Sequence, residues 1–329
     1  MSKRSRWIIC GIAFGALHLM IACAGFFAPY DPTTQNREQP YCPPARLHIF
    51  EPNGQMHFRP FFYAGPEGTK EQVALRFMVR GAAYRLFGFL PSRLHLFGTD
   101  GSPIFLLGTD SYGRDLFSRI LVGGQVSLLA GLAGAGISLG IGLLVGISAG
   151  FWGGWTDELL MRLAELFMAL PWIYLLFALR AFLPLSVAPA SALLLVISVI
   201  GAVGWARPAR LVRSVVLSVK ERDFVRAARG FGGSNLYLMR RHILPETSSV
   251  LLTQAALLIP QFILAEMTLS FLGLGVPEPI PSWGNLLSSL QQYSVLASYW
   301  WMYLPALALV PFFVGYLTIA SLLQERRTA

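Results

Sequence analysis

Long apolar runs, separated by shorter polar stretches, dominate the chain. A helix needs about 20 apolar residues to cross the ~30 Å hydrocarbon core of a bilayer. Six runs are long enough, at residues 7–27, 122–151, 159–183, 187–205, 250–272 and 299–323. We therefore predict an all-α polytopic membrane protein with about six transmembrane helices and an insertion between the first two.

The composition agrees with this prediction. Of the 329 residues, 54% are hydrophobic and only 13% are charged, which is too apolar for ordinary soluble domains. The net charge of +9 does not require nucleic acid, because membrane proteins gather Lys and Arg on their cytoplasmic side, and we expect no nucleic-acid partner. The three cysteines, Cys10, Cys23 and Cys42, imply no disulfide framework and no metal cluster.

The positions of the basic residues predict the orientation. Lys and Arg cluster at 3–6, at 205–246 and at 326–327, and six crossings place these three clusters on one side. We expect both termini in the cytoplasm. The predicted organisation is a tail and first helix (1–28), an external insertion (29–119), a membrane core (120–323) with a cytoplasmic loop at 206–246, and a cytoplasmic tail (324–329).

The N-terminal segment allows two interpretations. It has a basic start and an apolar run that contains the sequence "MIAC", which ends at Cys23. These features resemble a lipoprotein signal with its cleavage box ending at Cys23. The run of about 20 residues is longer than the 7 to 15 of a signal peptide, and this length favours an uncleaved membrane anchor.

The insertion carries two β-hairpin signals. Apolar and polar residues alternate around Asn53-Gly54, and a second Arg-Leu-His-x-Phe segment runs into Asp100-Gly101. A small cap of two hairpins and a loop with local turns both fit this pattern. Its histidines lack acidic or Cys partners at ligand spacing, so we expect ordinary surface residues and no metal site at His48, His57 and His95.

Small residues recur at four-residue spacing in the second apolar run. Gly136 and Gly140 form one ladder, and Gly142, Gly146 and Gly150 form another. Such ladders let a second helix approach the backbone closely. They predict a helix partner, in this chain or in another subunit.

The basic segment at 206–246 contains a short amphipathic helix. Its apolar positions recur at i, i+3, i+4 and i+7, at Phe224, Ala227, Ala228 and Phe231. Such a helix can dock into a groove on another protein or lie on anionic lipid headgroups. The small alanines bury little area, which favours the groove.

This segment resembles the signature of bacterial ABC importer permeases, in which Glu-Ala-Ala is followed after three residues by Gly and after nine more by Ile-x-Leu-Pro. The matching residues are Ala227, Ala228, Gly232, Leu244 and Pro245. Two positions depart from the signature. Arg226 stands where the family usually has Glu, and His242 stands where it has Ile.

Three further segments are similar to the second (C-type) permease of the dipeptide/oligopeptide/nickel branch of that family. They read "GTDSYGRDLFSRILVGGQVSLLAG" from residue 108, "AGFWGGWTDELLMRLAELFMALP" from residue 149 and "LAEMTLSFLGLGVPEPIPSWGNLLS" from residue 264. The resemblance implies a type I importer permease fold in the bacterial inner membrane, and the import of peptides or a related small solute. It leaves open whether that solute is a dipeptide, an oligopeptide or a nickel chelate.

The resemblance also implies partners. These are two cytoplasmic ATPase subunits that bind ATP and Mg, one of them receiving the helix at 224–233, a homologous second permease and an external substrate-binding protein. The residues agree, because the chain has no G-x-x-x-x-G-K-[ST] sequence with which to hold ATP. We therefore expect a transport subunit with no enzymatic activity and no cofactor of its own, in contact with membrane lipid.

Ionisable residues inside apolar runs are costly in lipid and usually face a cavity or a partner. Glu266 and Arg180 are predicted at similar depth near the outer side, as an outer-gate lining or as a purely structural pair. Glu165 is predicted to sit at the cytoplasmic interface or to pair with Arg162. Trp283, which follows the Pro-rich "PEPIPS", is predicted as an interfacial anchor on a rigid outer loop, which could also contact a binding protein.

Two other classes of membrane protein fit the sequence less well, a transporter or channel that works alone and a membrane enzyme. A secondary transporter or channel working alone would show internal repeats or broken helices at matching positions, and the sequence shows no such repeat. A membrane enzyme would carry a nucleophile or metal motif, but neither H-E-x-x-H nor G-x-S-x-G occurs. Neither class accounts for a docking helix.

Overall fold

The computed structural model describes residues 3–51, 55–64, 71–182 and 187–328. These residues form two compact units, which we treat separately. The helical unit comprises Met1–Gly11, Leu128–Leu269 and Phe312–Ala329, and the sheet unit comprises Ile12–Ser127 and Ser270–Pro311. Long helices run from one unit into the other.

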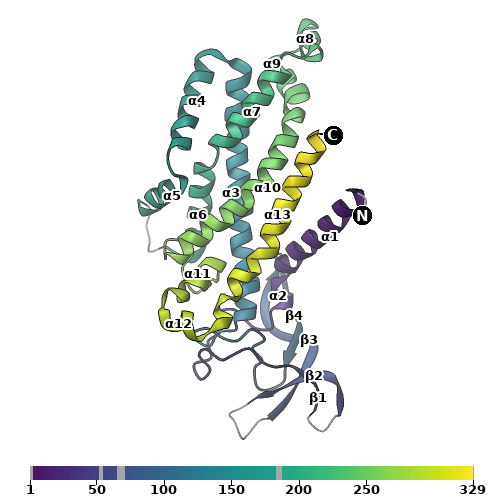
Figure 1. The fold of residues 1–329 in the computed structure, drawn as a ribbon, viewed down its shortest axis with the longest axis vertical. Helices are drawn as coiled ribbons and strands as arrows, with labels where there is room; N and C mark the ends of the chain where they lie inside the picture. The colour runs from purple at the N-terminus through teal and green to yellow at the C-terminus, as the bar shows by residue number, and fades with distance from the viewer. Residues whose placement is uncertain (1–2, 52–54, 65–70, 183–186, 329) are drawn as a thin grey trace. The chain divides into compact units, whose positions relative to one another are not determined.

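Most of the helical unit is built from a few long helices (Figure 1). Its main elements are α3 (Leu116–Trp152), α4 (Gly154–Ala169), α5 (Trp172–Ala181), α6 (Pro189–Val203), α7 (Ala206–Val219), α10 (Leu244–Phe271) and α13 (Leu304–Thr328). Two short helices, α8 (Asp223–Gly230) and α9 (Asn235–Leu238), and a π-helical turn (Met239–Ile243) join α7 to α10.

Three helical segments are long and apolar enough to cross a membrane, at Leu116–Trp152, Asn235–Phe271 and Trp300–Glu325. Two further pairs of helices are long and apolar enough when each bent pair is counted as one span. They are Gly154–Ala169 with Trp172–Ala178, and Pro189–Val203 with Ala206–Val219. A shorter apolar helix covers Ile8–Ala22 within α1 (Lys3–Ala22), and α2 (Ala24–Phe27) follows it. These six correspond to the six predicted runs.

The prediction of one continuous helix at 159–183 is wrong. The chain bends by 90° between α4 and α5. Pro171 stands at this break, with no backbone N–H to donate and with a ring that disfavours helix at the preceding residue, so Leu170 is extended. The last residue of that prediction, 183, lies outside the described residues.

The partner of the second glycine ladder is in this chain. A Cβ on Gly146 would lie 2.6 Å from the carbonyl oxygen of Ala209, and one on Gly150 would lie 2.8 Å from Cβ of Val216. Helix α7 therefore packs directly on the backbone of α3. The first ladder differs, because a Cβ on Gly136 or on Gly140 would meet no described atom within 4 Å.

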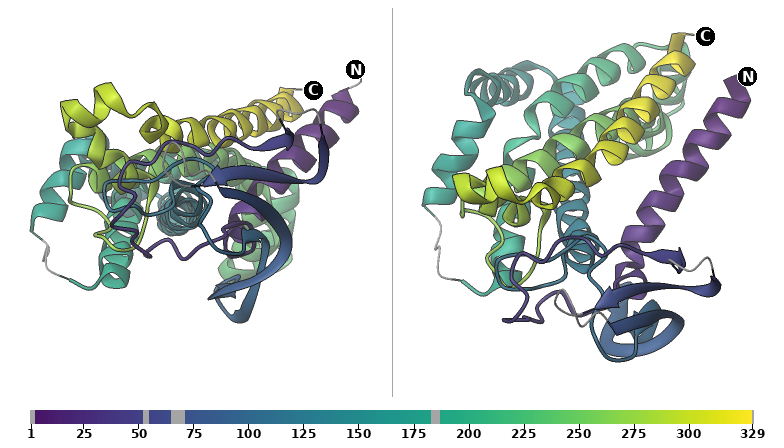
Figure 2. Two further views of the ribbon diagram at one scale, coloured as in Figure 1. Left: turned by 90° about the horizontal axis from the view of Figure 1, so that it is seen from below. Right: turned by 60° about the horizontal axis from the view of Figure 1, so that its bottom comes forward.

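The sheet unit contains one antiparallel sheet in the order β1-β2-β3-β4. Its strands are β1 (His48–Phe50), β2 (Met56–Ala64), β3 (Glu71–Leu86) and β4 (Leu90–Thr99), and Figure 2 shows β3 and β4 curving together as a coiled ribbon. The core consists of Phe62, Val73, Leu75, Phe97 and Ile104. Short helices α11 (Trp283–Leu287) and α12 (Tyr293–Ser298) belong to the same unit.

The first predicted hairpin is present and the second is wrong. β1 pairs with β2, with His48 opposite Phe61, although Asn53-Gly54 lies outside the described residues. The second Arg-Leu-His segment lies in β4, which pairs with β3. The β3–β4 turn forms at Phe87 and Gly88, both with positive φ, and not at Asp100-Gly101. β4 pairs with β3 because this long strand offers it more backbone hydrogen-bond partners than the six residues that follow Gly101 could offer.

The histidines of the sheet unit do not gather. His57 lies 2.7 Å from a Glu51 oxygen, and His48 stacks on Phe61. His95 was expected at the surface but is buried, with its ring nitrogens 2.6 Å and 2.9 Å from the carbonyl oxygens of Ala28 and Ala82. Within the described ranges, no group of three or more His, Cys, Asp or Glu is placed to hold a metal ion.

Candidate functional site

The short amphipathic helix predicted at 224–233 is present as α8, with clear ends, and its docking role stays a prediction. Arg222 precedes it in extended conformation, and Asp223 stands in its first turn, where a carboxylate interacts favourably with the helix dipole. At the other end, Gly232 has a φ of +84°, and the N–H of Gly233 donates to the carbonyl of Ala228 at 3.0 Å. These contacts close the helix with a glycine turn.

One side of α8 is attached to the helical unit. Val225 is buried in a cluster of apolar side chains from four elements. These are Ile147 and Phe151 of α3, Val212, Val216 and Val219 of α7, Leu238 of α9 and Ile243 of the π-helical turn. Ala228 packs against the same cluster. Val225 lies beside the predicted apolar face and was not predicted as a site residue. It attaches α8 to α3 and α7.

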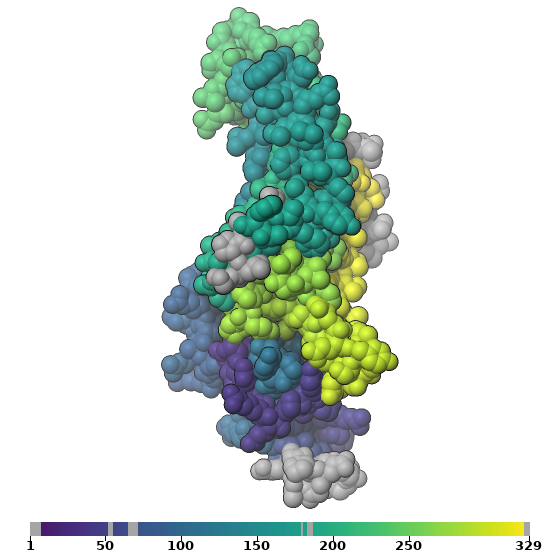
Figure 3. All heavy atoms as spheres, turned by 90° about the vertical axis from the view of Figure 1, so that its left-hand side faces the viewer, coloured from purple at the N-terminus to yellow at the C-terminus, as the bar shows by residue number. Residues whose placement is uncertain are grey.

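The other side of α8 is exposed and apolar. Phe224 and Phe231 are both exposed, Phe231 to 93%, and Ala227 lies between them on the same face. Further exposed apolar side chains follow at Leu236, Tyr237 and Leu244. Figure 3 shows this green segment forming the end of the helical unit. An exposed apolar patch with charged neighbours is typical of a protein-binding surface.

Arg226, which stands where the family signature has Glu, forms an ion pair with a nearby residue. Its guanidinium donates to Glu221 at 2.7 Å, on the exposed side of the segment. This hydrogen bond raises the pKa of Arg226 and lowers the pKa of Glu221. Water screens an exposed pair of this kind, so it orients the side chain more than it stabilises the fold.

Leu244 and Pro245 begin α10 directly after the π-helical turn. The N–H of Leu244 bonds to the carbonyl of Met239, five residues earlier, and Pro245 has no N–H to donate. His242, in this turn, lies 5.8 Å from the Phe224 ring and 5.5 Å from the Tyr237 ring. The turn thus joins α8, α9 and α10 into one block, and such turns are frequent at functional sites.

Glu266 and Arg180 are both buried, on α10 and α5. Burial of two ionisable groups in membrane helices is consistent with a pathway role and with a structural one. Their role therefore stays a prediction. Glu165 and Arg162 form the predicted ion pair, at 3.5 Å and exposed to solvent.

A cluster of charged residues in the sheet unit was not predicted as a site. Arg114 Nε lies 2.7 Å from Asp110 Oδ2, and its Nη1 lies 2.8 Å from Glu278 Oε2. Arg119 donates to Glu278 Oε1 at 2.8 Å and to the carbonyl of Pro32 at 3.1 Å. The sequence did contain a signal for this cluster, because its residues lie in the quoted segments that resemble the permease family. Three of them stand in "GTDSYGRDLFSR" and the fourth stands in "PEPIP".

Two residues next to this cluster are fully buried. Asp115 accepts hydrogen bonds from the backbone and the hydroxyl of Ser118, and burial raises its pKa to about 6. Trp283 was predicted as an interfacial anchor, which is wrong. Its side chain is 0% exposed, and Nε1 donates to the carbonyl of Ile120 at 2.9 Å.

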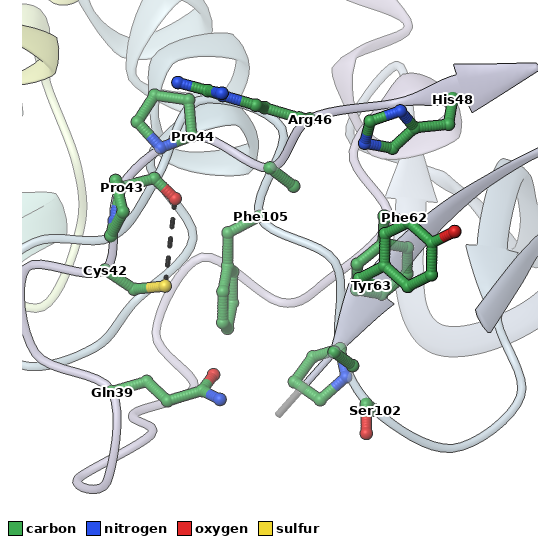
Figure 4. A pocket seen from close by; sticks show the side chains of 13 residues that line it. Gln39, Cys42, Pro43, Pro44, Arg46, His48, Phe62, Tyr63, Ser102 and Phe105 are labelled. Carbon is green, nitrogen blue, oxygen red and sulfur yellow. Dashed lines mark hydrogen bonds between the residues drawn. The ribbon is translucent and has the colours of Figure 1, made fainter. Parts of the chain in front are cut away.

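A cavity of about 950 Å³ also lies in the sheet unit (Figure 4). Arg46, His48 and Tyr63 line one part of it, and Gln39 and Cys42 line another. The Cys42 thiol lies 3.7 Å from the carbonyl of Pro43, and burial raises its pKa. A thiol with a raised pKa is a poor nucleophile.

Comparison with known proteins gives a consistent result. Residues 142–328 match the family described as "Binding-protein-dependent transport system inner membrane component". A Brucella suis protein whose name describes a peptide permease is 36% identical over 225 residues, which cover 68% of this chain and 72% of that protein. The oligopeptide transport system permease protein OppC of Haemophilus influenzae is 41% identical over 55% of this chain and 56% of its own length.

A solved structure, of an amino acid ABC transporter, is 19% identical to this chain. It aligns with a TM-score of 0.45 and covers 64% of this chain and 94% of its own. The family match begins at residue 142 and therefore includes α8 and Glu278, but neither the sheet nor the other cluster residues, Asp110, Arg114 and Arg119.

Proposed function

We propose, because this chain belongs to the family of inner membrane components of binding-protein-dependent transport systems, that it carries peptides across the bacterial inner membrane within an ATP-driven importer. It is a permease subunit, a transport protein with several membrane-spanning helices. The peptide substrate rests on the relatives from Brucella and Haemophilus, whose names describe peptide and oligopeptide permeases.

The exposed face of α8 supports the docking of an ATPase subunit. Phe224, Ala227 and Phe231 offer an apolar surface that a groove would remove from water, and Arg226 is held beside it by Glu221. Because Val225 anchors α8 to α3 and α7, a displacement of α8 would move these helices with it. ATP and Mg would bind to two such subunits, and this chain would supply the mechanical connection.

Further partners follow from the same family. A second permease would pack against this one, and the open glycine ladder at Gly136 and Gly140 suits close helix packing. A substrate-binding protein would deliver peptide on the external side. In this arrangement α8 and both termini face the cytoplasm, and Glu266 and Arg180 lie in or near the outer gate.

The docking proposal is tested by co-purification in mild detergent. Phe231→Asp and Ala227→Asp should each lose the ATPase subunit that copurifies with the wild-type chain, because a buried carboxylate in the groove is costly. Ser218→Asp adds the same charge to an exposed position on α7 and should retain the ATPase. We avoid Ala228, because it packs against the anchoring cluster and its replacement would disturb the fold.

The outcomes of this experiment distinguish docking on α8 from the alternatives. Loss in the two α8 variants but not in Ser218→Asp supports docking on α8. Retention in both α8 variants refutes that docking surface. If no ATPase accompanies the wild-type chain, a transporter working alone becomes the better interpretation. Uptake of a labelled peptide by cells with and without the chain tests the substrate.

A further inference from the structure

The hairpin formed by β3 and β4 turns back along the first apolar helix. The ring of His95 reaches the carbonyl of Ala28 at 2.6 Å, just after α2. Further along, the Tyr84 ring lies against Gly25, where a Cβ would be 2.2 Å from Tyr84 Cδ2. The Tyr84 hydroxyl donates to the carbonyl of Leu94 at 2.7 Å, which ties the two strands together at this level.

A groove of about 480 Å³ continues these contacts toward the middle of the helix. Its wall on the helix side includes Leu19, Met20 and Phe26, and its wall on the hairpin side includes Leu86 and Leu94. Leu19 precedes Ala28 by nine residues, which is about 13 Å along a helix at 1.5 Å per residue. The end of the hairpin therefore lies beside apolar residues of a segment long enough, with α2, to cross a bilayer.

The tip of the hairpin is exposed and apolar. Phe87, Phe89 and Leu90 are exposed to 50%, 76% and 51%, between Arg85 and Arg93. Residues 72–99 contain four Arg and no Asp or Glu. Aromatic side chains flanked by arginines suit the membrane interface, where rings enter the acyl region and guanidinium groups bind phosphate. In water, the same tip would leave three large apolar side chains unprotected.

We infer that the β3–β4 hairpin is a membrane anchor. Phe87, Phe89 and Leu90 insert into the outer leaflet beside α1, Arg85 and Arg93 bind the phosphates of anionic phospholipids, and an acyl chain fills the groove. The sheet unit is thereby held at the membrane surface. Arg76 pairs with Asp100 away from the tip, but residues 77–99, which include the tip, carry three Arg and no Asp or Glu. This excess of arginine near the tip favours lipid over a protein partner.

The test uses the full chain in nanodiscs that contain phosphatidylglycerol. Cys10, Cys23 and Cys42 are replaced by Ser, and Phe89→Cys carries an environment-sensitive fluorophore. Phe58→Cys is the matched control, since Phe58 is a fully exposed phenylalanine on β2 of the same sheet. Lipids brominated along the acyl chain should quench the probe at position 89 and shift its emission to the blue, whereas aqueous iodide should quench the probe at position 58.

A second measurement avoids the cysteine replacements. A photo-crosslinking amino acid at position 89, with the native cysteines retained, should yield lipid adducts. Arg85→Gln with Arg93→Gln should weaken the bromolipid quenching in anionic nanodiscs, and Arg59→Gln, on β2, should not. Iodide quenching at position 89 equal to that at position 58 would overturn the inference, and so would crosslinks from position 89 to a protein subunit.

Discussion

Arg119 donates to Glu278 across 159 residues of sequence, at 2.8 Å. This contact joins the beginning of α3 to the loop that follows α10. The guanidinium is 1% exposed, while the carboxylate is 44% exposed. Because Arg114 binds the same carboxylate and Asp110 as well, the cluster holds two segments in a defined register.

The first prediction concerns this cluster. Glu278→Gln removes the negative charge shared by two buried guanidinium groups, so the free energy of unfolding should fall by about 1–3 kcal/mol. Thermal unfolding in detergent, followed by tryptophan fluorescence, measures the loss. Glu38→Gln, an exposed position in the same unit, should leave the midpoint unchanged. Equal midpoints for Glu278→Gln and wild type would show that the cluster contributes nothing to stability.

The second prediction concerns pH. Burial raises the pKa of Asp115 from 3.8 to about 6, so the folded protein holds this proton more tightly than the unfolded chain does. The resulting stabilisation is fully present below 3.8 and is lost as the pH rises to about 6. Asp115→Asn should therefore remove a gain in stability that wild type shows on acidification through this window. Unfolding midpoints from about pH 4 to about pH 7 give the difference.

This difference has an upper bound. A shift of about two pKa units corresponds to about 3 kcal/mol, and relaxation around the carboxylate reduces it. The hydroxyl and backbone N–H of Ser118 can still donate to the amide oxygen in the variant, so its fold should persist. Parallel pH curves for the two proteins would contradict the assignment to Asp115.

The third prediction concerns the contact between α3 and α7. Gly146→Ala places a methyl group 2.6 Å from the carbonyl oxygen of Ala209, which cannot yield without moving the helix. We expect a loss of about 1–3 kcal/mol, as for an overpacked core. Gly140→Ala, on the same helix, meets no described atom of this chain, so in the chain purified without a second permease it should be neutral or slightly stabilising, because alanine favours helix. A comparison of thermal midpoints tests both variants.

The fourth prediction concerns Arg226. Arg226→Glu alone places a carboxylate beside Glu221 and should weaken retention of the ATPase subunit by disturbing the exposed side of α8. Exchanging both residues, as Glu221→Arg with Arg226→Glu, restores the 2.7 Å pair in reverse and should recover retention. Co-purification yields measure the recovery. A double variant as defective as the single one would show that the charge of Arg226 acts on the partner and not through Glu221.

Periodicity in the sequence was sufficient to predict most of the long helices, the short amphipathic helix α8 and the β1–β2 hairpin. These features depend on local spacing, such as apolar residues at i, i+3 and i+4 around Phe224 and alternation around Asn53. The same reasoning failed for β4, because its pairing with β3 depends on a competition between distant strands. It also missed Val225, whose burial depends on α3 and α7.

The apolar runs, the basic flanks and the docking signature follow from residue order alone, because each reflects a regular repeat or a local charge count. The burial of Trp283 and the joining of Arg119 to Glu278 do not. They arise when segments separated by tens to hundreds of residues compete for the same volume and the same hydrogen-bond partners. Only the folded chain decides which of them is buried, paired or left exposed.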